Sequence, residues 1–251
     1  MLLIEDLKVK LGRKEILKNI NLEIRPGETH ILFGPNGSGK TSLLMTIMGY
    51  PRYKVISGKI TFKGEDITHM NINERAELGI GMSYQRPPSI QGLKTGQLID
   101  ICSSNGGDTE SLAEEINFSE FLGRDINVGF SGGEIKKSEL LQLMAQDPDL
   151  YLFDEPESGV DLENIALIGN TINHLLHKNI HSTAKKSKKE IARERPKMGL
   201  IITHTGFILD YVTADRGQVL YNGVLACRSN PSAIFRQIKD EGYGECIRCA
   251  V

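Results

Sequence analysis

A glycine-rich stretch near the N-terminus has the residue types and the spacing that hold phosphate groups. It reads GPNGSGKT, which fits G-x-x-x-x-G-K-[ST], and it lies between a strand-like segment, THILFG, and a segment with helical periodicity. Glycines let successive backbone N–H groups turn toward phosphate oxygens, and a helix that starts at Lys40 adds its dipole. We expect Lys40 to contact the β- and γ-phosphates and the Thr41 hydroxyl to be a Mg²⁺ ligand. The residues of this predicted phosphate loop are Gly34, Pro35, Asn36, Gly37, Ser38, Gly39, Lys40 and Thr41.

A second chemical signal is an apolar segment that ends in two acids. It reads LYLFDEP and places Asp154 and Glu155 where a buried strand would end. Beside a phosphate loop, Asp154 is expected to hold Mg²⁺ through water, and Glu155 to polarise the water that attacks the γ-phosphate.

Gln85 and His204 also follow apolar, strand-like segments. In an open parallel sheet the strands' carboxyl ends meet at one crevice, so both side chains are expected near the phosphates. Gln85 could bridge Mg²⁺ and water, and His204 could contact the γ-phosphate. Taken singly, each residue is better explained as a structural polar residue, and it is their combination with the phosphate loop that favours a site.

The stretch NVGFSGGEIKK precedes a helical pattern. Ser131 and Glu134 have the S-x-x-E spacing of a capping box, which explains these two residues. It does not explain Gly132 and Gly133, each of which costs about 1 kcal/mol relative to alanine inside a helix. Paired glycines at a helix start favour close approach of an anion, so the loop is expected to bind phosphate.

The chain has 251 residues, and its 30 basic and 32 acidic side chains nearly cancel. This balance argues against a broad nucleic-acid-binding surface. No apolar run approaches the ~18–20 residues of a membrane span, and the N-terminus lacks the pattern of a signal peptide. Four scattered cysteines are too few for a disulfide scaffold. We expect a cytoplasmic protein that neither binds nucleic acid nor inserts into a membrane.

Strand-like and helical segments alternate along the chain, which favours an α/β fold with a mostly parallel sheet. We expect one domain over residues 1–251. Residues 1–85 and 131–251 would form the α/β core, including an antiparallel pair of strands in the first ~30 residues. Residues from about 86 to 130 read as a small helical subdomain, and the lysine-rich segment 178–198 as a surface insertion.

The order of these motifs, together with SGVD at 158–161, resembles the ABC-type ATPases over residues 1 to about 225. The resemblance implies a P-loop NTPase of the ABC type that binds ATP and Mg²⁺. It also implies a transient homodimer with two ATP molecules sandwiched head to tail. Ser131, Gly132 and Gly133 would then contact the ATP held by the phosphate loop of a second chain, with Glu134 in the same signature loop. Asp161 would lie at the same interface.

The segments FSGGE (130–134), GYPRYKVISGKITFKGEDI (49–67) and DEGYG (240–244) are similar to the SufC ATPases of iron–sulfur cluster assembly. That likeness implies SufB/SufD-like scaffold proteins as partners. Transporter cassettes usually carry an aromatic residue near position 11 to stack on adenine, whereas this chain has Leu11 and Gly12.

Two other functions stay open: the nucleotide-binding subunit of a membrane transporter, and an ATP-dependent regulatory protein with little hydrolysis. Intact Glu155 argues against the second. Cys246 and Cys249 have the C-x-x-C spacing of half a metal site or a redox pair, but also suit an incidental tail, and we predict no metal site there.

Overall fold

The computed structural model describes residues 1–103, 108–176 and 197–244. The predicted lysine-rich insertion (178–198) lies almost wholly outside these residues, as do Cys246 and Cys249. Among the described residues, no helix is long and apolar enough to cross a membrane.

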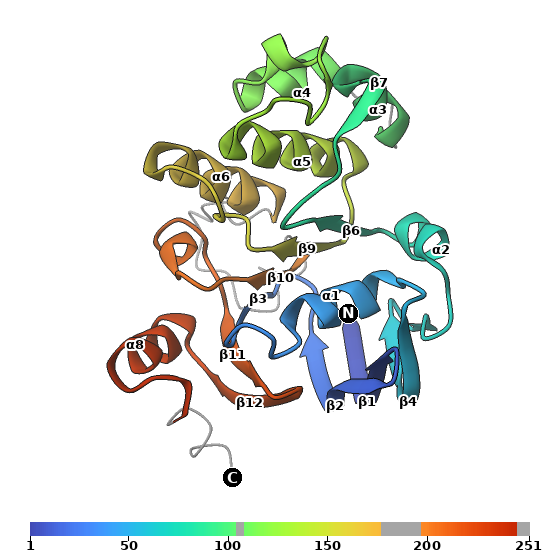
Figure 1. Cartoon of the computed structure of the whole chain (residues 1–251), viewed down its shortest axis with the longest axis vertical. Helices are drawn as coiled ribbons and strands as arrows, with labels where there is room; N and C mark the ends of the chain where they lie inside the picture. Colours follow the sequence, from blue (N-terminus) through green and yellow to red (C-terminus); the bar gives the residue numbers. More distant parts are fainter. Residues whose placement is uncertain (104–107, 177–196, 245–251) are drawn as a thin grey trace, which may run out of the picture.

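A six-stranded sheet with the order β12-β11-β3-β10-β9-β6 forms the centre of the molecule (Figure 1). Its strands pair in parallel except for the antiparallel hairpin β11–β12. The strands are β3 (Thr29–Phe33), β6 (Ile80–Ser83), β9 (Leu150–Asp154), β10 (Met198–Ile202), β11 (Arg216–Tyr221) and β12 (Val224–Ser229).

A second, antiparallel sheet comprises β2-β1-β4-β5. It is built mainly from the N-terminal segments, namely β1 (Leu2–Leu11), β2 (Lys14–Ile24), β4 (Tyr53–Phe62) and the short β5 (Glu65–Asp66). The prediction of an α/β fold with a mostly parallel sheet and an N-terminal antiparallel part is therefore confirmed.

Successive side chains of the parallel strands point to opposite faces of the sheet. Each face is buried in a hydrophobic core of its own. On one face Leu32, Leu152 and Leu200 pack with helix α1 (Lys40–Met48) and the antiparallel sheet. On the other face their neighbours, including Phe33 and Phe153, pack with helices α5 (Gly132–Gln146) and α6 (Leu162–Leu175). This two-sided burial explains why the strands read as continuous apolar runs.

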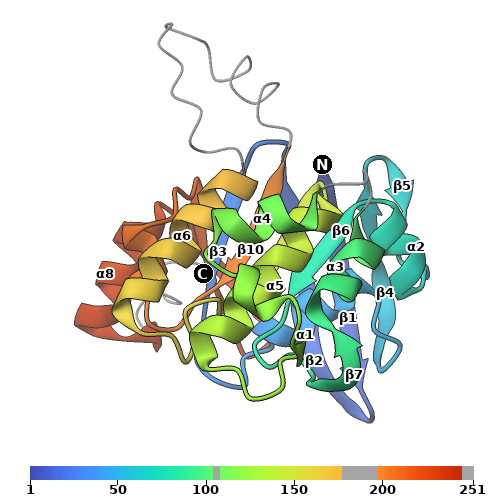
Figure 2. The same ribbon diagram turned by 90° about the horizontal axis from the view of Figure 1, so that it is seen from above.

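Helix α5 also carries a third core on its outer side. Leu141 and Ala145 pack with Ile99 of α3 (Thr95–Cys102) and Ala113 of α4 (Thr109–Glu115). Figure 2 shows α5 running beside α3 and α4, with α6 next to it. Helix α5 therefore packs both on the central sheet and on the helical region. The predicted boundary at residue 131 placed this helix in the α/β core alone.

The sequence analysis did not predict some short elements. Strands β7 (Ile90–Lys94) and β8 (Asp125–Ile126) pair around the helical region, and α2 (Ile72–Glu77) precedes β6. Within the predicted helical subdomain, α4 is followed by the 3-10 turn η1 (Ser119–Phe121). A 3-10 turn η2 (Phe207–Asp210) and helix α8 (Pro231–Glu241) complete the chain.

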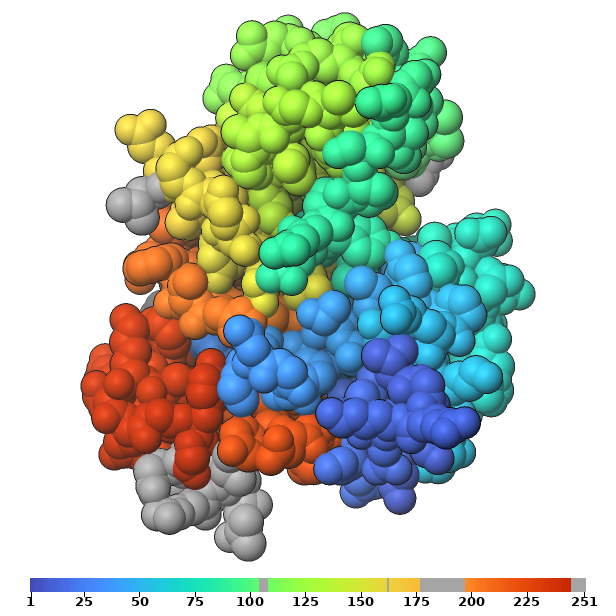
Figure 3. All heavy atoms as spheres, in the orientation of Figure 1, coloured from blue at the N-terminus to red at the C-terminus, as the bar shows by residue number. Residues whose placement is uncertain are grey.

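The N- and C-terminal parts of the chain lie side by side. Figure 3 shows the surface of β11, β12 and α8 (orange to red) beside that of the first strands (blue), with the helical region (green) at the other end of this face. The Arg228 guanidinium of β12 donates to the Asn21 carbonyl oxygen of β2 at 2.9 Å.

Candidate functional site

The predicted phosphate loop connects β3 to α1 and lines a pocket of about 600 Å³. Gly34 has no room for a side chain, because a Cβ atom there would lie 2.2 Å from the Leu220 carbonyl oxygen. The ammonium of Lys40 donates to the carbonyl oxygens of Gly34 and Pro35 at 2.8 and 3.1 Å, within its own loop. Burial lowers the pKa of Lys40 to about 8. The loop thus keeps one buried amine beside the pocket.

Thr41, in the first turn of α1, contacts Asp154, the last residue of β9. The Thr41 hydroxyl donates to Asp154 Oδ1 at 3.3 Å, and Asp154 is 1% exposed. Burial raises the pKa of the Asp154 carboxyl, partly offset by this hydrogen bond. Hydroxyl and carboxylate oxygens such as these are of the kind Mg²⁺ prefers. No group of three or more His, Cys, Asp and Glu side chains suited to a metal ion occurs in the described part of the chain.

Glu155 lies between the two other predicted site residues. The Gln85 amide donates to Glu155 Oε2, and His204 Nε2 pairs with Glu155 Oε1. All three residues line the phosphate pocket. Glu155 has φ of 52°, a left-handed conformation that is uncommon outside glycine and clusters at functional sites. The backbone therefore turns sharply after β9, and the carboxylate reaches the strand ends on both sides.

His204 is held in place by a residue that the sequence analysis missed. Glu157 is buried, and its Oε1 accepts hydrogen bonds from the hydroxyls of Thr203 and Thr205, on either side of His204. Burial raises the pKa of the Glu157 carboxyl. Burial lowers the pKa of His204, and the charge of Lys40 adds to this effect, so the neutral imidazole is favoured. An acid two residues after Glu155 was the only sequence signal for this contact.

The signature loop forms the capping box that its sequence predicts. Ser131 Oγ accepts from the Glu134 backbone N–H, and Glu134 Oε2 accepts from the Ser131 N–H at 2.7 Å. Gly132 packs against the backbone of Gly159, in the turn after β9. The need for glycine at position 132 therefore has a cause within this chain. Ser131, Gly132 and Gly133 are not among the described residues that line the phosphate pocket.

Asp161 caps the start of α6. Its Oδ1 accepts from the Asn164 backbone N–H at 2.9 Å, and these contacts lower the pKa of its carboxyl. Its side chain is exposed. The structure therefore gives Asp161 a local role and leaves the predicted interface role a hypothesis.

One wall of the phosphate pocket is formed by residues outside the phosphate loop. It consists of Lys14, Ile16 and Lys18 of β2, with Asn222 and Gly223 from the turn between β11 and β12. No Phe, Tyr or Trp side chain occurs among the described residues that line this pocket. Leu11 and Gly12, where the sequence analysis looked for a stacking aromatic, are not among the described residues that line this pocket, and Ile16 gives it an aliphatic wall.

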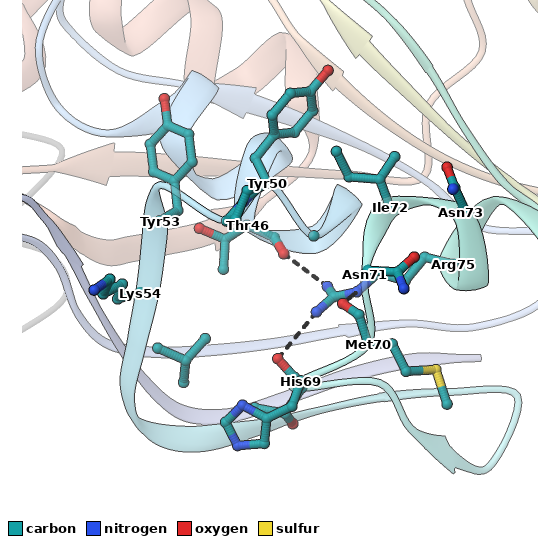
Figure 4. A pocket seen from close by; sticks show the side chains of 14 residues that line it. Thr46, Tyr50, Tyr53, Lys54, His69, Met70, Asn71, Ile72, Asn73 and Arg75 are labelled. Atoms are coloured by element: carbon teal, nitrogen blue, oxygen red, sulfur yellow. Dashed lines mark hydrogen bonds between the residues drawn. The ribbon is translucent and has the colours of Figure 1, made fainter.

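A second pocket, of about 580 Å³, lies at the far end of α1 (Figure 4). Tyr50, Tyr53 and Met70 contribute to its lining. The buried Arg75 guanidinium donates to the carbonyl oxygens of Thr46 and Ile47, both at 2.8 Å, in the last turn of α1. Arg75 therefore stabilises that helix end, where a cation is favoured by the helix dipole.

The chain matches a protein-family model, several relatives by sequence, and solved structures by fold. The model of the ABC transporter family matches residues 17–158. The chain is 35% identical to the "Probable ATP-dependent transporter ycf16" of Cyanidium caldarium, over 97% of this chain and 95% of that protein. It is 33% identical to the "Probable ATP-dependent transporter SufC" of Escherichia coli, over 97% and 98% of the two chains. A solved nucleotide-free ATP-binding cassette from an ABC transporter has a TM-score of 0.74 at 23% identity, covers 98% of each chain and shares the fold.

Proposed function

Because this chain belongs to the ABC transporter family and is an ATPase of that type, we propose that it hydrolyses Mg·ATP to drive a conformational change in a SufB/SufD-like scaffold for iron–sulfur cluster assembly. The observation that carries the catalytic part is the position of Glu155, which contacts both Gln85 and His204 at the phosphate pocket.

Substrate phosphates would be held by the loop from Gly34 to Thr41. Its backbone N–H groups and the N-terminus of α1 favour anions. Lys40 now donates to carbonyl oxygens of its own loop, and a phosphate oxygen would replace them as a better acceptor for its ammonium. A phosphate beside it would also raise the pKa of this amine, which burial has lowered.

Thr41, Asp154 and Gln85 would hold the Mg²⁺ that accompanies ATP. The ion would supply Lewis-acid stabilisation of charge that develops on the β- and γ-phosphate oxygens. Asp154 needs no movement for this role, because it is already buried beside Thr41.

Glu155 is proposed as the general base. Its two oxygens are occupied by Gln85 and His204. Each carboxylate oxygen has a second lone pair, so Glu155 can accept a proton from water while Gln85 and His204 hold it in place. Both partners are also groups that phosphate or Mg²⁺ could engage. His204, kept neutral and steadied through Thr203 and Thr205, would then orient the γ-phosphate.

The signature loop is proposed to act on ATP held by a second copy of the chain. Ser131 is exposed at the start of α5, away from the lining of its own chain's phosphate pocket. The start of a 15-residue helix with paired glycines suits a phosphate oxygen. A transient ATP-sandwiched homodimer would complete two sites at once.

A scaffold partner is proposed from full-length similarity to SufC and from the FSGGE and DEGYG segments. The second candidate is a nucleotide-binding subunit of a membrane transporter. It is favoured by one observation, that both relatives are named as probable ATP-dependent transporters.

Two measurements test the proposal. Phosphate release by the full chain should require Mg²⁺, stop with a chelator, and rise severalfold when SufB/SufD-like proteins are added. Affinity purification from its own cell should recover those proteins from the aqueous extract. Recovery of membrane subunits instead would favour the transporter, and ATP binding without phosphate release would favour a regulatory protein.

A further inference from the structure

Two charged residues of α5 are buried against the end of β6. Lys136 is 3% exposed and Glu139 is 5% exposed. They are three positions apart, so they lie on one face of the helix. Neither belongs to the phosphate loop, to the acidic strand end or to the signature loop, so the proposed mechanism leaves both without a role.

Both side chains bind the backbone that leads to Gln85. Lys136 Nζ donates to the carbonyl oxygens of Tyr84 at 2.7 Å and Gln85 at 3.3 Å. The Glu139 carboxylate accepts from the Tyr84 backbone N–H and is also hydrogen-bonded by the Ser83 side chain. Both backbone polar groups of Tyr84 are therefore held by side chains of one helix, 52 and 55 residues further along the chain.

A third contact fixes the same residue from the opposite direction. The Tyr84 hydroxyl hydrogen-bonds the Tyr50 hydroxyl at 2.7 Å. Further down the strand, Gly81 packs closely on the last part of α5, and a Cβ atom there would lie 2.7 Å from Leu143 Cδ2. Helix α5 is therefore joined to β6 at Gly81 and to the segment after β6 at Tyr84 and Gln85.

This arrangement is costly. Burial lowers the pKa of Lys136 and raises that of Glu139, so both charged forms are disfavoured by desolvation. Lys136 and Glu139 each bind backbone groups, and apolar residues of similar volume often stabilise a protein as well as buried charged residues do. A function for the pair other than stability is therefore worth testing.

We propose that Lys136 and Glu139 are positioning residues that fix Gln85 to the signature helix, so that Gln85 and Ser131 move as one body. Helix α5 starts at the signature loop and reaches Tyr84 within its second turn. A displacement of Gln85 by Mg²⁺ or γ-phosphate would therefore displace Ser131, which the second ATP contacts. The inference rests on the proposed function, because it assigns Gln85 and Ser131 to ATP.

A double-mutant cycle in the full chain tests this coupling. Lys136→Met keeps the aliphatic stem and removes the donor, and Lys137→Met is the matched control on the same helix. If Lys136 acts through Gln85, Lys136→Met and Gln85→Ala should each lower Mg·ATP hydrolysis by about tenfold, and the double variant should be no slower than the slower single one, within about twofold. The control should stay within about twofold of wild type. Rates that multiply to about a hundredfold loss would overturn the proposal, because Lys136 would then act independently of Gln85.

Variants at Glu139 distinguish a role in positioning Tyr84 from a role in packing alone. Glu139→Leu removes the acceptor of the Tyr84 N–H, whereas Glu139→Gln keeps an oxygen in its place. We expect Glu139→Leu to lower hydrolysis about tenfold with ATP affinity unchanged, and Glu139→Gln to restore most of the rate. Equal loss in both variants would contradict the role.

Hydrogen exchange supplies a readout that does not depend on hydrolysis. Exchange of the Tyr84 amide should accelerate at least tenfold in Glu139→Leu, while amides of β9 and β10 keep their wild-type rates. Uniform acceleration would mean a general loss of stability and would overturn the proposal. A wild-type chain that binds but does not hydrolyse ATP would refute the proposed function, and the exchange result would still decide whether the contact holds Tyr84.

Discussion

Gly132, the first residue of α5, lies so close to Gly159 that a Cβ atom on it would be 2.0 Å from the Gly159 carbonyl oxygen. This contact links the signature loop to the turn that follows Glu155. The two segments are 27 positions apart in the chain, and each carries residues assigned here to ATP. Their spacing is thus set by backbone packing that tolerates no side chain.

Gly132→Ala should therefore destabilise the protein, although alanine is the better helix former by about 1 kcal/mol. The methyl group must push the two backbone segments apart, and overpacking of this kind costs about 1–3 kcal/mol. Chemical denaturation should show the loss. Gly123→Ala is the control, because a Cβ atom added at Gly123 would meet no other atom within 4 Å. Equal stability of the two variants would contradict the close contact.

Glu155→Gln should keep ATP binding and nearly abolish hydrolysis. The amide has the same shape but cannot accept the proton of water, and loss of a general base costs about 10²–10⁴ in rate. ATP should accumulate in a closed dimer, detectable by size-exclusion chromatography with Mg·ATP. Glu163→Gln, an exposed change in the first turn of α6, serves as the control. Hydrolysis near the wild-type rate in Glu155→Gln would remove Glu155 from this role.

Glu139 should make stability depend on pH. Burial raises the pKa of its carboxyl to about 7, and the Tyr84 N–H, the Lys136 ammonium and the Ser83 hydroxyl oppose that rise. The folded state thus binds the proton more tightly than the unfolded state does. Protonation of Glu139 therefore adds to the free energy of unfolding. This contribution is fully present below the unfolded pKa of about 4.3 and is lost as the pH rises through about 7.

The comparison that isolates this effect is wild type against Glu139→Gln, which cannot titrate at that position. The free energy of unfolding of the wild type should fall relative to the variant by up to about 3 kcal/mol between pH ~4.5 and ~7.5. Denaturation curves at four pH values in this range would measure it. Parallel pH profiles for the two proteins would mean that Glu139 does not change its protonation on unfolding.

Much of the site could be predicted because its residues sit at strand ends. Gln85, Glu155 and His204 each follow an apolar run, and the carboxyl ends of parallel strands share one edge of a sheet. The structure places all three around one pocket. Local patterns also predicted the capping box of Ser131 and Glu134, because both partners lie within one turn.

The remaining contacts could not be predicted, because they join distant segments through side chains with no local pattern. Glu157 reaches Thr203 across 46 positions, and Glu139 reaches Tyr84 across 55. From the sequence alone, a charged residue that is buried on a helix cannot be told from an exposed one, because the strand that it contacts is not known. The sequence analysis explained Gly132 by phosphate binding alone, because no sequence pattern indicates that Gly159 packs against it.

The head-to-tail arrangement makes a sharper prediction about two chains. If Ser131 acts on ATP held by another copy, a chain with Lys40→Ala and a chain with Ser131→Asp should complement each other in a mixed dimer on the scaffold. Aspartate can still cap α5, since it is as good an N-cap as serine, but its charge repels phosphate. One composite site then carries both defects and the other carries neither, so mixed dimers purified through two different tags should show about half of the wild-type rate. Ser131→Asn, a neutral cap of the same shape, should be much less impaired than Ser131→Asp and reports any loss that comes from capping alone. If the loop instead serves its own chain's ATP, every site in the mixed dimer has one defect and no activity returns, which would refute the head-to-tail arrangement.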